Sequence, residues 1–220
     1  MSALGLVIFD CDGVLVDSEQ ISNRVLAGML AGEGLRMTVA QARERYQGLL
    51  LTEVVARAET ELGHTLSADF LERYTRERAE AFRRELQPVA GAREVVEAVI
   101  GAGVGVCVAS QGALSKTALS LALTGLGDLF PEHARFSAES VAHGKPEPDL
   151  FLLAASAMGT HPTACAVLED TPSGVLAARA AGMRAFGLAA DSDEAELRAA
   201  GAEIVHALDE LPARLGLISD

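Results

Sequence analysis

The chain contains little cysteine, little lysine and few aromatic residues, and it has no long hydrophobic run. Among its 220 residues there are three cysteines, two tyrosines and no tryptophan. Because Cys11, Cys107 and Cys165 are far apart and lie within apolar stretches, we expect reduced core thiols in a cytoplasmic protein. No apolar run approaches the roughly 20 residues that span a bilayer, and the N-terminus lacks the regions of a signal peptide.

The charge balance is strongly acidic. Asp and Glu number 31 against 18 Lys and Arg, so the formal net charge is −13. Such a chain is a poor partner for nucleic acid or an anionic membrane, and we expect neither. Half of the residues are apolar and 22% are charged, which excludes a mainly disordered chain. The length fits one domain with an insertion, and we expect a monomer or a weak dimer.

Short apolar runs alternate with helical patterns along most of the chain. Runs typical of strands buried on both faces of a parallel sheet occupy residues 4–9, 104–109, 164–168 and 185–188. Helical periodicity occupies residues 113–123, 148–158 and 173–181. This alternation predicts an α/β fold with a doubly wound, Rossmann-like parallel sheet as its core.

One long stretch after the first predicted strand interrupts this alternation. Apolar side chains recur at helical spacing from Ile21 to Leu30, and residues 52–62 are helical throughout. Ser67 is a candidate N-cap for a further helix that ends near Leu86. The stretch contains no strand pattern.

We therefore expect two domains. An all-helical cap domain is predicted over residues 18–86, inserted into an α/β core that comprises residues 1–17 and 87–220. The chain is expected to cross between the domains near residues 15–20 and 84–91.

Polar side chains follow three of the predicted strands. The strands lead into Asp10-Cys11-Asp12-Gly13, Ser110-Gln111-Gly112 and Glu169-Asp170-Thr171. Because the carboxyl ends of parallel strands share one edge, we expect these groups to converge. Two carboxylates 4 Å apart repel by about 4 kcal/mol at an effective dielectric of 20, so they need a shared proton or a cation. An all-oxygen set of few carboxylates suits Mg²⁺, whereas the five histidines show no zinc-type spacing and are predicted to lie at the surface.

Only two lysines are present, Lys116 and Lys145, against 16 arginines. Lys145 lies in the segment His143-Gly144-Lys145-Pro146-Glu147-Pro148-Asp149, where the prolines stiffen the loop, so we expect a fixed ammonium group near the acids. Lys116 is expected to be solvated. Five arginines of the inserted stretch are candidates for binding a phosphorylated or carboxylated tail, although surface solvation is the favoured interpretation of each: Arg43, Arg45, Arg73, Arg76 and Arg78.

Four motifs in order resemble those of the haloacid dehalogenase-like superfamily, in its phosphatase and phosphomutase branch. They are residues 10–19, Ser110, Lys145 within Gly-Lys-Pro-Glu-Pro-Asp, and residues 168–174. The resemblance covers essentially the whole chain, and the helical insert lies where subfamily I of this superfamily has its type 1 cap. The resemblance implies a Rossmann-like core and an enzyme that acts on a small phosphorylated metabolite.

The resemblance also implies roles for individual residues. Asp10 would attack phosphorus and form an aspartyl-phosphate, and Asp12 would act as general acid and then general base. Ser110 and backbone N–H groups near Gln111 would bind the phosphoryl oxygens, and Lys145 would neutralise charge between Asp10 and the phosphoryl group.

A metal site follows from the same resemblance. Mg²⁺ would be held by the Asp10 carboxylate, the Asp12 backbone carbonyl and Asp170, with Glu169 near or behind it. Asp12 also separates branches of the superfamily, because its dehalogenases lack an acid two residues after the nucleophile. Dehalogenation is therefore not expected.

Two other reactions of strand-end carboxylates remain as alternatives. In a β-phosphoglucomutase-like enzyme a cap histidine stands about twelve residues past the nucleophile, where this chain has Ser22, and an arginine follows a cap glycine by three residues. If Gly48 is that glycine, the arginine position is Leu51, so a phosphatase similar to bacterial sugar-phosphate and 6-phosphogluconate phosphatases is favoured. The three leucines that follow Gly48 fit either a pocket wall or burial against cap helices. A phospho-accepting receiver module would lack both the helical insert and Asp12.

Overall fold

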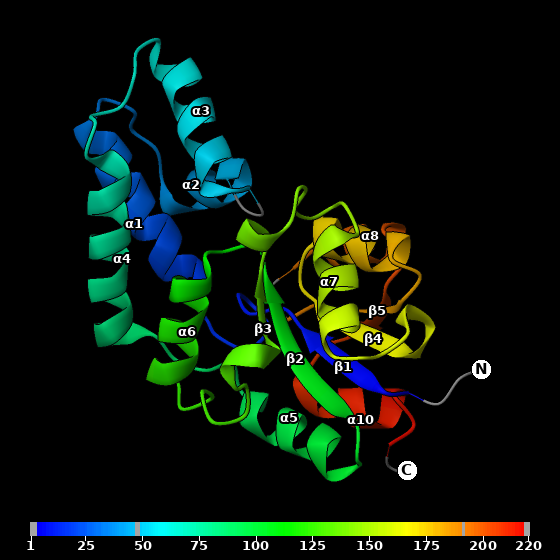
Figure 1. Ribbon diagram of the computed structural model, residues 1–220. Coiled ribbons are helices and arrows are strands. Elements are labelled where there is room, and N and C mark those ends of the chain that lie inside the picture. The colour runs from blue at the N-terminus through cyan, green and yellow to red at the C-terminus, as the bar shows by residue number, and fades with distance from the viewer. Residues whose placement is uncertain (1–3, 47–48, 191, 218–220) are drawn as a thin grey trace.

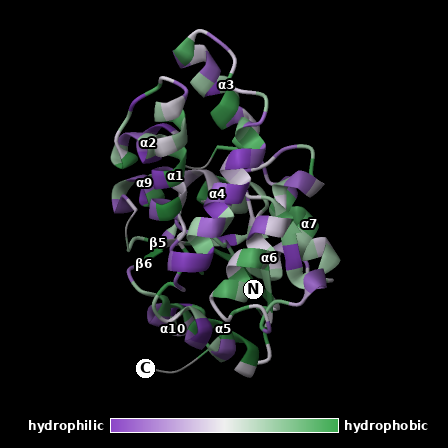
Figure 2. Ribbon diagram, turned by 90° about the vertical axis from the view of Figure 1, so that its left-hand side faces the viewer, coloured by the Kyte–Doolittle hydropathy of each residue, from purple (hydrophilic) through white to green (hydrophobic). Residues whose placement is uncertain are grey.

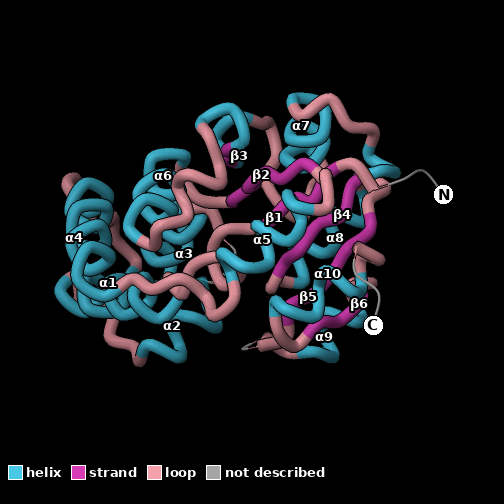
Figure 3. The backbone as a smooth tube through the Cα atoms, turned by 90° about the horizontal axis from the view of Figure 1, so that it is seen from below, coloured by secondary structure: helices cyan, strands magenta, loops and turns pink. Residues whose placement is uncertain are grey.

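The computed structural model describes residues 4–46, 49–190 and 192–217, in which a parallel sheet flanked by helices carries a group of helices at one side (Figure 1). The six strands are β1 Leu6–Phe9, β2 Gly105–Ser110, β3 Arg135–Ser137, β4 Cys165–Glu169, β5 Arg184–Leu188 and β6 Glu203–Val205. Their order across the sheet is β3-β2-β1-β4-β5-β6, and all pairs are parallel, as the magenta strands of Figure 3 show side by side. The predicted doubly wound α/β fold is confirmed.

Strand β1 lies in the middle of the sheet, where both of its faces are covered. All of its side chains are accordingly apolar and buried. It pairs with β2 on one side and with β4 on the other, with Phe9 opposite both Val108 and Leu168. The four strands predicted from apolar runs are all present. Strands β3 and β6 have three residues each and lie at the two edges, where Arg135 and Glu203 begin them without an apolar run.

Helices cover both faces of the sheet and bury a separate apolar cluster on each. One face carries α5 Ala92–Gly101, α6 Leu114–Leu123 and α10 Leu211–Arg214. The other carries α7 Asp149–Ala157, α8 Pro172–Ala180 and α9 Glu194–Ala199. Helices such as α5 mix hydrophilic and hydrophobic residues along their length (Figure 2), since only the side toward the sheet is buried. Cys11, Cys107 and Cys165 are buried and unpaired, as expected.

Four more helices lie beside the sheet, at the upper left of Figure 1: α1 Glu19–Gly32, α2 Val39–Tyr46, α3 Leu51–Leu62 and α4 Phe70–Glu85. They bury their own apolar cluster, which includes Leu30, Ala58 and Phe70. Helix α2 is absent from the sequence-based prediction, because only Ala42 and Tyr46 of its eight residues are buried and no apolar stripe marks it.

The predicted N-cap of the last of these helices is wrong. Asp69 precedes α4, whereas the Ser67 hydroxyl donates to Glu33 Oε1 at 2.6 Å, beyond the end of α1. Arg73 joins the same carboxylate oxygen at 2.8 Å. Ser67 therefore fixes the loop against α1 instead of starting α4, a tertiary contact that local spacing does not reveal.

The chain enters and leaves this helical group through two adjacent segments. The Asp17 amide donates to Gln87 O at 3.0 Å, and the Val89 amide donates to Leu15 O at 3.0 Å. The outgoing and returning backbones are thus hydrogen-bonded to each other. Among the described residues, no helix is both long enough and apolar enough to cross a membrane.

Candidate active site

Three acids from the ends of two neighbouring strands meet at the carboxyl edge of the sheet. Asp10 follows β1, and Glu169 and Asp170 end and follow β4; all three are buried. One carboxylate oxygen from each lies within 4.8 Å of the others. The predicted convergence of these strand-end acids is therefore confirmed.

Lys145 lies among these acids and is itself buried. Its Nζ is 2.5 Å from Asp10 Oδ1, 2.5 Å from Glu169 Oε1 and 3.1 Å from the carbonyl oxygen of Ala109. The backbone amide of Lys145 donates to Gln111 Oε1 at 3.0 Å, which fixes the loop. If all three acids are ionised, one ammonium leaves two negative charges unbalanced, and this donor set of oxygens fits a hard divalent cation.

The same crowding shifts the protonation of the acids. Burial, opposed by Lys145 and reinforced by Glu169, raises the pKa of Asp10 to about 7. Burial and the neighbouring carboxylates of Glu169 and Asp10 also raise the pKa of Asp170 well above its ordinary value. Without a cation, Asp10 holds its proton toward the neutral range and the neutral form of Asp170 is also favoured, so metal binding must displace protons.

Glu169 is oriented by the loop that follows it. Its Oε2 accepts hydrogen bonds from the Asp170 amide at 3.1 Å and from the Thr171 amide and hydroxyl at 3.2 and 2.9 Å. A Cβ added at Gly174, in the first turn of α8, would lie 1.9 Å from the Glu169 carboxyl carbon. Glu169 therefore needs a glycine there, and with both oxygens engaged it is better placed to orient its neighbours than to bind a metal itself.

Asp12 faces a second set of partners. Its Oδ1 accepts from Ser18 Oγ and Lys116 Nζ, and its Oδ2 is 3.4 Å from Ser110 Oγ. Although burial favours the neutral form, Lys116 and Ser18 together hold the pKa of Asp12 below its ordinary value. Asp12 is thus held as a carboxylate next to, but outside, the three-acid cluster.

Lys116 corrects the sequence-based expectation, because it is only 9% exposed and not solvated. It lies in the first turn of α6, directly after the loop that ends β2, so its side chain reaches the carboxyl edge of the sheet. The rarity of lysine, which indicates a functional role for Lys145, indicates one for Lys116 as well.

Ser110 and Gln111 lie in the loop that ends β2. Ser110 is fully buried, and its Oγ accepts from the Gly112 amide at 3.1 Å. The carbonyl oxygen of Gln111's side chain is used by Lys145. The hydroxyl of Ser110 therefore lies beside Asp12, with loop amides around it.

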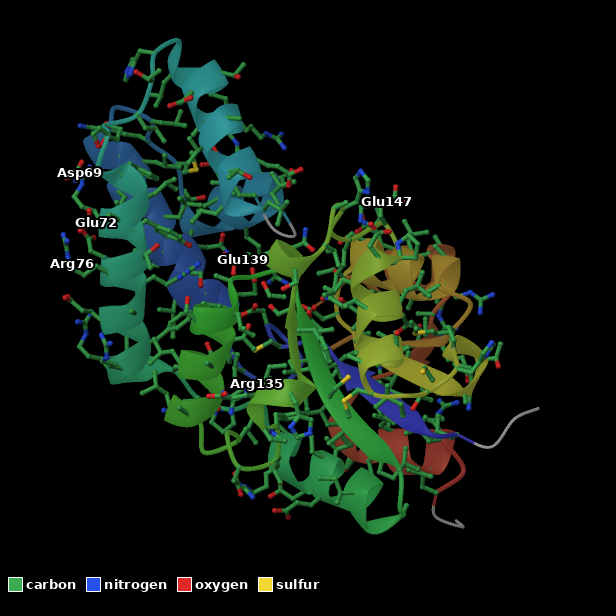
Figure 4. All side chains as sticks on the ribbon, in the orientation of Figure 1. Asp69, Glu72, Arg76, Arg135, Glu139 and Glu147 are labelled. Carbon is green, nitrogen blue, oxygen red and sulfur yellow. The ribbon has the colours of Figure 1, made fainter. Side chains whose placement is uncertain are left out.

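A cavity of about 380 Å³ opens above these groups, between the strand ends and helices α1 to α4. Its floor includes Asp10, Asp12, Lys145 and Asp170. The side made by the helical group is lined by Glu19, Ser22, Asn23, Leu26, Tyr46, Leu49, Leu50, Leu51, Thr52, Val54, Tyr74 and Arg78. Glu139 also lines the cavity and lies between the helical group and the sheet (Figure 4).

The sequence left open whether Leu49, Leu50 and Leu51 form a pocket wall or are buried against helices, and the structure shows both. They line the cavity, while Leu49 and Leu51 also pack against the apolar cluster of the helical group and Leu50 packs against that of the core. Gly48, read as the glycine of a mutase motif, lies outside the described residues. The five histidines are exposed, as expected.

The family model of the haloacid dehalogenase-like hydrolases matches residues 4–182. The chain belongs to this family. Among its relatives, the 6-phosphogluconate phosphatase of Escherichia coli (strain K12) is 32% identical over 192 residues, which cover 87% of this chain and 85% of the relative. The fructose-1-phosphate phosphatase YqaB of the same organism is 36% identical over 183 residues, covering 81% of this chain and 93% of the relative.

Solved structures of this family agree with the fold. A β-phosphoglucomutase-like protein from Thermotoga maritima has a TM-score of 0.79 and 26% identity, covering 98% of this chain and 100% of that one. The family thus includes both phosphatase and mutase neighbours of this haloacid dehalogenase-like chain. The choice between phosphate hydrolysis and phosphoryl transfer depends on the residues that line the cavity.

Proposed function

We propose that this phosphoric monoester hydrolase is a Mg²⁺-dependent phosphatase that hydrolyses a small sugar phosphate through an aspartyl-phosphate intermediate. The observation that supports this most is the position of Asp10, whose Oδ1 contacts Lys145 on the floor of the cavity beside Asp170. A nucleophilic carboxylate with a fixed ammonium and an adjacent oxygen-donor cluster suits phosphoryl transfer, which depends mainly on positioning and charge compensation.

The reaction divides between Asp10 and Asp12. Asp10 attacks phosphorus, the bond from phosphorus to the ester oxygen breaks, and Asp12 donates a proton to the leaving oxygen. Because Asp12 is a carboxylate in the free site, it takes up this proton when the anionic phosphoryl group binds beside it and raises its pKa. Asp12, now a carboxylate, then takes a proton from water, whose oxygen attacks the phosphorus of the aspartyl-phosphate. Inorganic phosphate leaves, Asp10 is restored, and Asp12 carries its proton again.

The remaining site residues bind and orient. Asp10, the Asp12 backbone carbonyl and Asp170 would hold Mg²⁺, which supplies positive charge that offsets the carboxylates and the phosphoryl oxygens. Glu169 orients Lys145 through the ion pair at 2.5 Å. Ser110, backbone amides near Gln111 and the Lys145 ammonium bind the phosphoryl oxygens.

The helical group completes the substrate site. We take residues 18–86 as the cap and residues 1–17 and 87–220 as the catalytic core, since the cavity lies between these parts. When the cap closes over the substrate, it excludes bulk water and sets the shape of the pocket. A cytoplasmic location, a monomer or weak dimer and the absence of nucleic-acid or membrane partners stay predictions.

A β-phosphoglucomutase-like transfer is the alternative function. Ser22 and Leu51 line the cavity at the positions where the mutase pattern has a histidine and an arginine. A leucine offers no cation for the second phosphate of a bisphosphate, so the mutase pattern is not met at this position, which favours hydrolysis. The named substrates of the two Escherichia coli relatives, 6-phosphogluconate and fructose 1-phosphate, support a phosphorylated sugar or sugar acid as the substrate.

The proposal is tested by phosphate release from a panel of sugar phosphates and an aryl phosphate in Mg²⁺, with glucose 6-phosphate formation from β-glucose 1-phosphate assayed in parallel. Asp10→Asn should abolish release while the protein stays folded, and EDTA should stop the wild-type reaction until Mg²⁺ is added back. The exposed Asp209→Asn is the matched control and should behave as wild type. Turnover by Asp10→Asn, or activity that persists in EDTA, contradicts the mechanism.

A further inference from the structure

Arg78 is a cation of the cavity wall that comes from the cap. It lies in the middle of α4, is half-buried and lines the cavity, and its guanidinium carbon is 4.8 Å from the centroid of the Tyr74 ring. Tyr74 is itself buried one turn earlier on the same helix. An aromatic face holds a guanidinium group in a defined plane, so Arg78 is oriented without a carboxylate.

The other cations of the cavity are already neutralised. Lys145 is ion-paired with Asp10 and Glu169, and Lys116 is ion-paired with Asp12. Within the described part of the chain, no Asp or Glu oxygen lies within 4.0 Å of the Arg78 guanidinium group. By contrast Arg73, on the same helix, is bound by Glu33 and Asp69. Arg78 is therefore a half-buried cation that contacts Tyr74 and has no carboxylate partner among the described residues.

Arg78 and Asp12 line the same cavity, Arg78 from the cap and Asp12 from the strand end. The proposed proton donor to the leaving oxygen is Asp12, which lies on the floor of the cavity that Arg78 lines from the cap. The sugar part of the substrate extends from the ester oxygen away from phosphorus. It must therefore occupy the space between Asp12 and the cap wall that holds Arg78.

The other polar groups of the cap side include the neutral hydroxyls of Ser22, Tyr46 and Thr52 and the carboxylate of Glu19, and Arg78 is the cap cation of this wall among the described residues. Leu26, Leu51 and Val54 are apolar, and Asn23 donates to the backbone carbonyl and carboxylate of Glu19 at 2.9 and 3.1 Å. A guanidinium group presents paired N–H donors that match the two oxygens of a carboxylate, and such charge-assisted pairs are stronger than bonds to a neutral hydroxyl.

We propose that Arg78 binds a carboxylate on the sugar part of the substrate, so that the enzyme prefers phosphorylated sugar acids to the matching phosphorylated alcohols. This rests on the proposed function, because it takes the phosphoryl group to be bound at Asp10. It adds a specificity-determining residue and narrows the substrate class from sugar phosphates to sugar-acid phosphates.

The experiment compares kcat and KM for two substrates that differ only at carbon 1, D-gluconate 6-phosphate and D-glucitol 6-phosphate, in saturating Mg²⁺. Wild-type protein should prefer the acid in kcat/KM by about 10- to 100-fold, the range expected for one charge-assisted contact. Arg78→Gln should reduce this preference to within about threefold, mainly by raising KM for the acid. Arg78→Lys should keep part of the preference, because it retains charge and loses the paired donors.

Two controls separate this proposal from the function on which it rests. Arg76→Gln removes the same charge from the outward side of α4, where Figure 4 shows Arg76 pointing away from the sheet, and should keep the wild-type preference. Arg78→Gln should lower kcat/KM for an aryl phosphate without a carboxylate far less than it lowers kcat/KM for D-gluconate 6-phosphate. If the aryl phosphate is hydrolysed but wild type does not distinguish the two sugars, the carboxylate proposal is wrong and the phosphatase stands.

Two further outcomes would overturn the Arg78 proposal or the proposed function. If Arg78→Gln lowers kcat/KM equally for both sugars and the aryl phosphate at an unchanged melting temperature, Arg78 serves the phosphoryl group and the proposal fails. If wild type hydrolyses no phosphate ester at all, the proposed function fails first.

Discussion

Lys116 and Lys145 are the two lysines of the chain, and both end on carboxylates of the loop that follows β1. Lys145 contacts Asp10, the proposed nucleophile, and Lys116 contacts Asp12, the proposed acid and base. Each aspartate thus has its own ammonium partner, although the two lie close together in sequence. Burial and Lys145 leave the pKa of Asp10 at about 7, whereas Lys116 keeps that of Asp12 below its ordinary value.

Replacing Lys116 by methionine tests this division. Lys116→Met keeps the length of the side chain and removes its charge, so Asp12 loses both its main electrostatic partner and its fixed orientation. General acid–base catalysis is worth about 10²- to 10⁴-fold, and we expect kcat for an aryl phosphate to fall by about 10- to 100-fold. Steady-state kinetics in saturating Mg²⁺ measure the loss.

The exposed neighbour Ser115 supplies a control on the same helix turn. Ser115→Ala should leave kcat unchanged. A Lys116→Met protein with wild-type kcat would mean that Asp12 needs no cation and that Lys116 has only a structural role.

At the scale of elements, the sequence predicted best what is apolar and buried. Strand β1 and its neighbours β2 and β4 have continuous apolar runs because helices cover both faces of the sheet at its centre. The edge strands β3 and β6 and the exposed helix α2 lack such runs, since few of their side chains are buried. Their formation depends on neighbours that are distant in sequence.

The site residues likewise fall into those that the sequence predicts and those that it does not. Asp10, Asp12 and Asp170 are recognisable because strand ends and motif spacing place them at one edge. Lys116 and Arg78 reach the cavity from helices α6 and α4, and their roles depend on how those helices pack, which spacing along one chain does not determine. The sequence does not distinguish Arg78 from the four other candidate arginines of the cap, and for all five it favours a solvated surface position.

Two glycines, Gly13 after β1 and Gly159 after α7, share a left-handed backbone but differ in what lies next to them. Gly13 has φ 75°, and a Cβ there would lie 2.1 Å from Asp170 Oδ2. Its backbone must therefore approach the carboxylate of the neighbouring strand closely. Gly159, after α7, has φ 65° but no atom within 4 Å of an added Cβ, so it shares the conformation and lacks the contact.

This pair gives a prediction for the first loop. Gly13→Ala adds both the left-handed strain of about 1–2 kcal/mol and a clash that displaces Asp170, so Mg²⁺ activation should weaken by at least about tenfold. Gly159→Ala adds the strain alone and should leave the Mg²⁺ dependence unchanged. Activity titrated with Mg²⁺ and thermal unfolding measure the two effects. Equal Mg²⁺ dependence in both variants would show that Asp170 does not need this approach.

For the whole molecule, acidity and metal binding are linked. The formal net charge is −13, and three buried acids add local repulsion at the sheet edge. A group whose pKa is higher in the folded than in the unfolded state stabilises the fold below its unfolded pKa and loses that contribution as the pH rises through its folded pKa. For Asp10 this window runs from about 4 to about 7.

The metal-free protein should therefore become less stable between pH 5.5 and pH 8. In EDTA we expect the free energy of unfolding to fall by on the order of 2 kcal/mol, or about 4–8 °C in melting temperature. Mg²⁺ at pH 8 should restore this stability, because it binds only the folded, deprotonated cluster. Asp170→Asn should raise the melting temperature in EDTA at pH 8 and remove the response to Mg²⁺, whereas Asp209→Asn should do neither. A metal-free protein that melts higher at pH 8 than at pH 5.5 would mean that the buried acids are not what limits its stability.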